Sequence, residues 1–263
     1  MLTRPTRQAV LHLIVAFVAF VGLVSHTVRA AGVFEDAAAE AGFLCAPQRN
    51  AVVARMTTTS APVVSASVVV MGARFDVSPW LLFAIEQPFV TASSDADGVV
   101  TGFGDLRLRS RITLARRPGK RLSLLPAVGT GSGTTDVFPY ASQALELGAA
   151  LAWSDTMGVV EYWATGGGVL VRRAPTGLSP ALRHVGFTRI SAGTAYAIGR
   201  GGIRVGGEYL GFQGGFARAV FFAQFTWDVR DRFRFGMSGS VESGHHDVRV
   251  MDSSVAVNLD VSF

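Results

Sequence analysis

The chain of 263 residues is long enough for one large domain, and 49% of its residues are hydrophobic. Its one cysteine excludes an internal disulfide and a cysteine-based zinc cluster. The net charge of +5 falls to +2 if a leader carrying Arg4, Arg7 and Arg29 is removed, so we expect no nucleic-acid partner.

Residues 1–30 have the pattern of a secretory signal peptide. Arg4 and Arg7 precede an apolar run over 10–24, and Ala30 ends a motif that suits signal-peptidase cleavage. The run is shorter than the ~20 residues that cross a bilayer as a helix, and a short membrane anchor is the alternative interpretation.

Residues 31–48 are the least strand-like part of the chain. We expect them to form a periplasmic lead-in, or a segment that lies in the lumen of the β-barrel predicted by the residues after them.

Residues 49–263 predict an all-β fold, a transmembrane antiparallel up-and-down β-barrel of about twelve strands, within a range of about ten to fourteen. No apolar run after the leader is long enough for a membrane helix, so a membrane-embedded chain must close its strands into a barrel. The expected strands are 50–59, 64–76, 80–91, 102–116, 121–131, 142–154, 157–171, 182–198, 201–212, 216–228, 232–244 and 252–263.

The connections between these segments alternate in type. Tight turns are expected at 76–79, 117–120, 155–156, 199–201 and 228–231, and mostly longer polar or Gly-rich loops at 92–101, 132–141, 173–181, 213–215 and 244–251. Outer-membrane barrels have this asymmetry, with short periplasmic turns and longer outside loops. A soluble β-sandwich has no reason to sort its turns in this way.

Side chains within the segments sort into two faces. Around residue 110, Leu106, Leu108 and Ile112 share one face, whereas Arg107, Arg109 and Arg111 share the other. Three like charges on one strand face are too costly for a soluble core, so the apolar face is predicted to point outward to lipid and the polar face inward.

Several aromatic residues suit the interfacial girdles of a membrane barrel. They lie near strand ends or on faces expected to point outward, although ordinary packing explains any one of them equally well. The candidates are Trp80, Trp153, Trp163, Tyr209 and Trp227.

The last segment, 255–263, alternates apolar and polar residues and stops on an aromatic side chain. We interpret Leu259, Val261 and Phe263 as an assembly signal for the barrel-assembly machinery, with Phe263 at the periplasmic rim.

Three segments resemble a family of outer-membrane proteins named for phenol meta-cleavage degradation pathways. They are Arg74-Phe75 with Trp80-Leu81 and Pro88-Phe89-Val90, then Gly102-Phe-Gly-Asp-Leu106, then Leu125-Pro126 with Gly129-Thr130-Gly131. The chain departs from the family pattern at Arg111-Ile112 and at Gly129. The resemblance implies a transporter-like outer-membrane barrel for small apolar or aromatic molecules, which commonly need a lateral route through the wall.

Charged residues on the inward faces are the candidate site. They either form a constriction that selects solutes or a salt-bridged core that keeps the barrel rigid. The main candidates are Arg107, Arg109, Arg111, Glu146, Glu161, Arg204, Glu208, Arg218, Arg234 and Asp260, with Glu86, Arg189 and Glu242 as further inward charges.

The predicted function is passive or facilitated passage of a small solute, anionic or apolar, across the outer membrane of a Gram-negative cell. The expected partners are that solute and the lipid and lipopolysaccharide of the membrane; the oligomeric state is left open, and no cofactor or metal is expected. One alternative is a plugged structural barrel. Another is a lipid- or lipopolysaccharide-modifying enzyme in which Ser240 or Ser243 would meet His245 or His246.

Overall fold

A computed structural model describes residues 43, 49–60, 64–94, 98–134, 145–172, 186–212, 217–230, 232–243 and 253–263. The expected signal peptide, most of the lead-in and most of the long loops lie outside these residues. No helix among the described residues is long and apolar enough to cross a membrane.

Thirteen antiparallel strands in the described residues form one sheet. Their bounds are β1 Ala51–Ser60, β2 Val64–Ser78, β3 Leu81–Ser94, β4 Gly98–Phe103, β5 Arg107–Arg117, β6 Lys120–Gly129, β7 Leu145–Met157, β8 Val160–Arg172, β9 Gly186–Ile198, β10 Gly201–Phe212, β11 Ala217–Arg230, β12 Phe233–Ser243 and β13 Ser253–Ser262.

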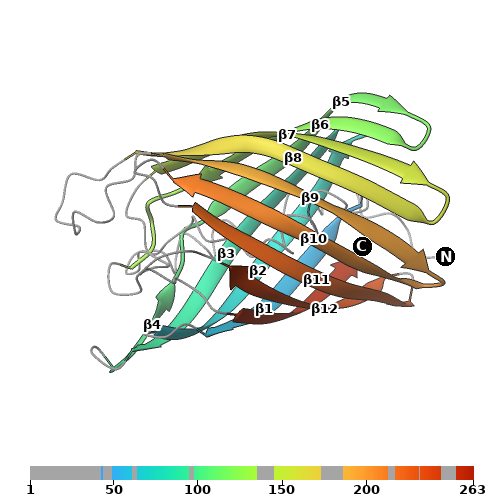
Figure 1. Cartoon of the computed structure of the whole chain (residues 1–263). Coiled ribbons are helices and arrows are strands. Elements are labelled where there is room, and N and C mark those ends of the chain that lie inside the picture. Colours follow the sequence, from blue (N-terminus) through green and yellow to red (C-terminus); the bar gives the residue numbers. More distant parts are fainter. Residues whose placement is uncertain are drawn as a thin grey trace.

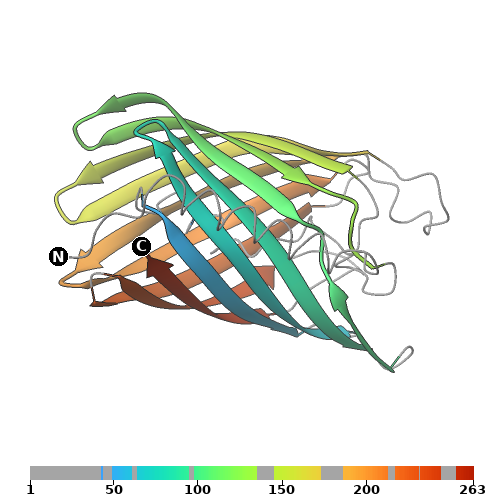
Figure 2. The ribbon, with the colours of Figure 1, turned by 180° about the vertical axis from the view of Figure 1, so that it is seen from behind.

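The sheet closes on itself (Figures 1 and 2). Strands that follow one another in the chain pair with each other, except that β3 pairs with both β4 and β5, and β1 pairs with β13 along its whole length, from Ala51 opposite Ser262 to Ser60 opposite Ser253. Twelve strands thus form a closed ring, whose backbone hydrogen bonds are made within the protein as a bilayer requires, and β4 is an extra strand that pairs with β3 alone among the described strands.

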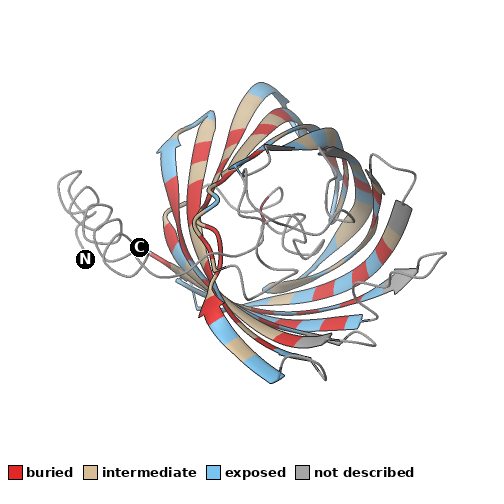
Figure 3. Ribbon diagram, turned by 90° about the vertical axis from the view of Figure 1, so that its left-hand side faces the viewer, coloured by how far each residue is buried: buried red, intermediate tan, exposed pale blue. Residues whose placement is uncertain are grey.

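The predicted alternation of faces is confirmed. On β13, Val255 is 57% exposed on the outer surface whereas Ala256 is 1% exposed and points inward. Seen along the barrel, buried and exposed residues alternate along many of the strands (Figure 3). The outer surface therefore carries the large apolar side chains and the interior carries the charges, the reverse of a soluble protein.

Four of the five expected girdle aromatics face outward, and the prediction for Trp163 is wrong. Trp80, Trp153, Tyr209 and Trp227 are between 42% and 56% exposed, whereas Trp163 is 2% exposed and lies inside the barrel. Trp163 is two positions after the inward-facing Glu161, so the strand period of two places both side chains on the same face.

Tight turns gather at one end of the barrel, the right-hand end in Figure 1. All five are two-residue loops between paired strand ends, and three of them contain a glycine with positive φ: Gly119 (75°), Gly158 (63°) and Gly199 (55°). Glycine adopts this conformation without the steric cost that a Cβ atom brings. The turn expected at 155–156 lies instead at 158–159, because the β7–β8 pairing continues to Met157 opposite Val160 and Gly158 supplies the turn conformation.

One expected strand is divided in two, which corrects the prediction of a continuous strand over 102–116. The C-terminal part of β3 pairs with β4, up to Phe89 opposite Phe103, and the N-terminal part of β3 pairs with β5, from Glu86 opposite Arg107. Residues 87–88 of β3 therefore lie opposite three residues, 104–106. The regular strand pairing of the twelve-stranded wall is interrupted there.

The contacts of the interruption explain its position. The Gly104 amide donates to the Pro88 carbonyl oxygen at 2.7 Å, and a Cβ atom on Gly104 would lie 2.6 Å from the Pro88 Cβ. Asp105 is fully buried, and its Oδ1 accepts from the Gly133 amide at 2.8 Å. The Thr130 amide donates to the Leu106 carbonyl at 3.0 Å. Residues just after β6 therefore hydrogen-bond to Asp105 and Leu106, which do not pair with β3.

We predict that Gly104→Ala destabilises the barrel, because the new methyl group overlaps Pro88. The expected loss is about 1–3 kcal/mol, the usual cost of overpacking, measured as the urea midpoint of unfolding from liposomes. Gly166→Ala is the matched control, since a Cβ there would meet no heavy atom within 4 Å. Equal midpoints for the two variants would contradict the close contact at residue 104.

Candidate functional site

Three arginines of β5 line the inner wall as predicted, and all are deeply buried. Arg107, Arg109 and Arg111 are 9%, 4% and 2% exposed. Across the strand pair they face Glu86, Ala84 and Leu82 of β3, respectively. The Arg109 Nη2 donates to Glu86 Oε2 at 2.7 Å. Removing a guanidinium from water costs free energy, and the ion pair with a carboxylate offsets part of that cost.

Phe43 occupies the space beside this ladder. Its side chain is 7% exposed and packs against Leu82 and Ala84. The guanidinium carbon of Arg109 lies 5.4 Å from the centre of the Phe43 ring, within the range of a cation–π interaction. The Arg111 Nη1 donates to the Phe43 carbonyl oxygen at 3.2 Å. A residue that precedes the first strand is therefore held inside the barrel.

Other arginines of the interior pair with carboxylate or amide side chains on nearby strands. Arg74 of β2 donates to Asp260 of β13 at 3.2 Å and so reaches across β1. Arg189 of β9 donates through its Nε to the Glu208 carboxylate of β10. Arg204 of β10 donates to the side-chain amide oxygen of Gln224. Mixed charges thus neutralise each other between strands rather than within them.

A bidentate ion pair lies near the end of the barrel that carries the tight turns. Asp228 accepts from Arg234 at two atoms, Nε at 2.7 Å and Nη2 at 2.8 Å, a bidentate arrangement. Arg49 lies just before β1 and comes within 3.9 Å of the same carboxylate. Burial and the neighbouring Arg234 lower the pKa of Arg49 from its usual value, while Asp228 opposes that shift.

Phe43 and Arg49 touch opposite walls. Phe43 contacts β3 and β5, and Arg49 contacts β11. With β4 counted as the continuation of β5, six strand-to-strand steps separate β5 from β11 in either direction round the barrel. The two contacts therefore lie on opposite sides of the barrel in strand order.

The remaining predicted residues are distributed over the wall. Glu146 is buried on β7, and Glu161 lies 3.9 Å from Arg121. The side chains of Arg218 and Glu242 lie outside the described residues. At the closing seam the Phe263 amide donates to the Asn50 carbonyl at 3.3 Å. Leu259 and Phe263 are exposed on the outer surface and Val261 is half-buried.

Sequence reasoning missed Arg74, Phe43, Trp163 and Phe222 as interior residues. Trp163 lies two positions from Glu161, and Phe222 lies two positions from Gln224. Because strand side chains alternate with a period of two, the inward direction of Glu161 and Gln224 predicts that Trp163 and Phe222 also face inward. For Phe43 no local signal existed, because its partner Arg111 is 68 residues away in the chain.

The residues of the enzymatic alternative do not come together in the described part of the chain. The Ser240 Oγ lies 2.6 Å from the Ser254 Oγ on the inner wall, and both histidines of that alternative fall outside the described residues. Over the same residues there is no group of three His, Cys, Asp or Glu side chains that could hold a metal ion.

Comparison with known proteins places the fold among outer-membrane β-barrels. No family model and no curated protein matches the chain. The COG4313 outer membrane channel from Pseudomonas putida F1 has a TM-score of 0.72 at 10% identity, over 82% of this chain and 95% of that chain.

Two porins are also similar. The NanC porin gives a TM-score of 0.57 at 9% identity over 81% of this chain and 98% of its own. The KdgM porin in complex with disordered oligogalacturonate gives 0.55 at 7% identity, over 81% and 99%. At these identities the likeness shows the fold, a closed antiparallel outer-membrane barrel.

We predict that Glu86→Ala destabilises the barrel much more than Glu161→Ala. The first change removes a 2.7 Å ion pair of the Arg109 guanidinium, whose side chain is 5% exposed, a loss of about 3 kcal/mol for breaking a buried pair. The second removes a 3.9 Å contact between side chains that are about one-quarter exposed, a loss of about 0–1 kcal/mol. Urea-induced unfolding in liposomes compares the two; similar losses would contradict a structural role for the Arg109 pair.

Proposed function

We propose that the protein is a passive channel of the bacterial outer membrane, through which a small solute diffuses along a polar interior and past Phe43. The observation that carries this proposal is the inner wall itself: closed, lined with ion pairs, and surrounded by an apolar outer surface. A barrel of twelve strands lies between small barrels filled by side chains and large barrels that enclose an aqueous channel.

The channel folds of the similar structures support this function, although their solutes belong to those proteins. The resemblance to the phenol-pathway family would favour an apolar or aromatic solute, whereas the arginine ladder favours an anion. We propose an anionic bias, because the positive charge is concentrated on one strand, β5, beside the solute path.

Phe43 is proposed to set the width of the path at the end with the tight turns. It lies before β1 and yet inside the barrel, and Arg49 contacts Asp228 on the far side of the barrel in strand order, so these two residues are proposed to narrow the solute path. This is the lumen alternative expected for residues 31–48, and it combines a channel with a partial plug.

Residues 1–30 are proposed to act as a signal peptide that leads the chain to the outer membrane, where lipid and lipopolysaccharide surround the barrel. The barrel-assembly machinery is the proposed receptor for Leu259, Val261 and Phe263. The exposure of Phe263 beside the β1–β13 seam supports this role, since the ring is available to a partner before closure.

We predict that Phe43→Ala raises the single-channel conductance in planar bilayers and shifts the reversal potential in a KCl gradient toward anions. Removing the ring widens the solute path and exposes the Arg109 guanidinium to the passing ions. Phe221→Ala is the control, because that ring is 56% exposed on the outer surface. A wild-type protein and a Phe43→Ala variant that are both non-conducting would contradict the channel function and favour a plugged structural barrel.

A second prediction concerns assembly. Phe263→Asp should lower the amount of folded, heat-modifiable protein in the outer membrane several-fold, because the change removes the terminal aromatic ring. The same variant refolded in detergent should lose little stability, since the ring is 38% exposed. Normal amounts of folded Phe263→Asp protein in cells would refute the assembly role.

A further inference from the structure

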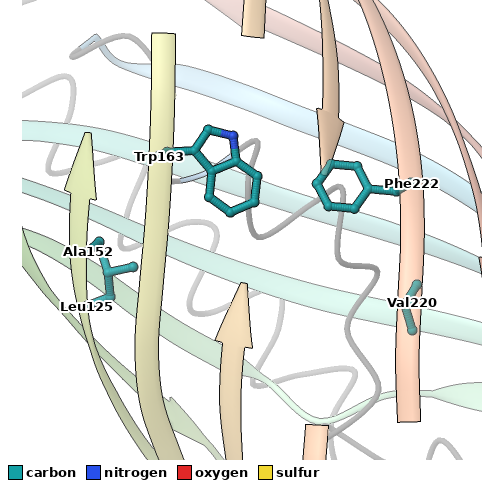
Figure 4. Packing of buried hydrophobic residues seen from close by; sticks show 5 residues of the cluster. All are labelled: Leu125, Ala152, Trp163, Val220 and Phe222. Carbon is teal, nitrogen blue, oxygen red and sulfur yellow. The ribbon is translucent and has the colours of Figure 1, made fainter. Parts of the chain in front are cut away.

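Two aromatic rings inside the barrel meet over a floor of two glycines. Trp163 of β8 pairs with Gly193 of β9, Gly193 pairs with Gly206 of β10, and Gly206 pairs with Phe222 of β11. The four residues form one row across four strands. The ring centres of Trp163 and Phe222 lie 6.1 Å apart at an angle of 25° (Figure 4).

The glycines are required by the rings. A Cβ atom at Gly193 would lie 2.6 Å from the Trp163 Cζ2, and one at Gly206 would lie 2.9 Å from the same atom and 2.8 Å from the Phe222 Cζ. These distances are shorter than any normal carbon–carbon contact. Each ring therefore lies along the wall over glycine backbone instead of crossing the lumen. We call these four residues the aromatic ledge.

The ledge carries one polar group with no partner. The indole Nε1 of Trp163 is buried and has no hydrogen-bond acceptor in the part of the chain that the structure describes. A buried donor of this kind costs about 1–3 kcal/mol and is rare in a folded protein. It marks a position where an acceptor from outside the wall would be favourable.

Polar rows border the ledge on both sides. The row that lies two residues from the ledge, on the side of the long loops, contains Thr165, Ser191 and Glu208. The Thr165 and Ser191 hydroxyl oxygens are 2.6 Å apart. Two residues toward the tight-turn end, the corresponding row contains Arg204 and Gln224, which hydrogen-bond to each other. The ledge thus has hydroxyl, carboxylate, amide and guanidinium groups on two sides, and it packs with Leu125, Ala152 and Val220 in one buried apolar cluster.

We propose that the aromatic ledge binds a hydroxylated ring solute, a pyranose sugar, during its passage. The proposal rests on the channel function proposed above. The C–H face of a pyranose packs on aromatic rings, its oxygens accept from the Trp163 indole, and its hydroxyls reach the two polar rows. A purely apolar solute would leave the Trp163 indole without an acceptor, since the bordering polar groups already hydrogen-bond to one another or to Arg189.

The ledge is covered in this structure, since Trp163 is 2% and Phe222 is 5% exposed. A sugar that reaches the rings must take the place of the contacts that now cover them. Binding is therefore a competition, which we expect to be weak and fast enough to permit passage rather than capture.

The test compares D-glucose with D-mannitol, an acyclic polyol that cannot present a ring face. Wild-type channels in planar bilayers should show a saturable decrease of ionic current with glucose and a weaker effect with mannitol. Trp163→Leu should weaken the glucose effect about tenfold, as expected for the loss of an aromatic stacking contact. Gly206→Ala should weaken it similarly by displacing both rings.

Gly207→Ala is the matched control for the glycine variant. Its Cβ would face Phe221 at 3.4 Å, an ordinary contact on the outer side of β10. It should retain the glucose effect. If Gly206→Ala fails to fold, Trp163→Leu alone decides the outcome.

Tryptophan fluorescence tests sugar binding at the ledge independently of the channel function. Trp80, Trp153 and Trp227 face outward, so the difference in emission between the wild type and Trp163→Phe reports on the ledge in detergent without any conduction. A glucose-dependent change in this difference supports the ledge even if no conductance is found. Identical responses to glucose and mannitol in both assays, or a response to benzoate but not to glucose, would overturn the proposal.

Discussion

The inward direction of every charged strand face is the constraint on which the rest of this barrel depends. Twelve closed strand pairs satisfy the backbone, and the period of two then sends each arginine of β5 to the interior. Slippage of β5 by one residue would turn Arg107, Arg109 and Arg111 to the apolar outer surface. The ion pair between Arg109 and Glu86, which joins β5 to β3, therefore fixes register as well as neutralising charge.

The interruption of the wall at residues 104–106 gives a physical meaning to the family resemblance. Its three segments, which contain Pro88, Gly104 and Thr130, are distant in sequence but meet at this interruption. Proline removes a backbone donor and glycine removes a side chain, and the Asp105 carboxylate takes up the Gly133 amide. In this chain the residues quoted for the resemblance therefore form the interruption of the strand pairing.

Much of this fold followed from the sequence, because alternation and turn residues are local signals. Most strand positions, the two-residue turns at Gly119 and Gly199, and the inward arginines follow from neighbours in the chain, whereas the turn at Gly158 was expected at 155–156. The division between β4 and β5 did not, since the residues around Gly104 alternate like one strand and only the contact with Pro88 interrupts it. Among the site residues, Phe43 could not be placed, because its contacts depend on how the barrel closes.

The two sides of the interior solve the same spatial problem differently. On the side of β5, long arginine side chains are accommodated next to Leu82 and Ala84, and their charge is balanced by Glu86 and by Phe43. On the side of β8 to β11, two large rings are accommodated because their neighbours have no side chain at all. In a barrel this narrow, each large inward residue requires a small inward residue beside it, so glycines on the lumen face identify where bulky functional groups lie.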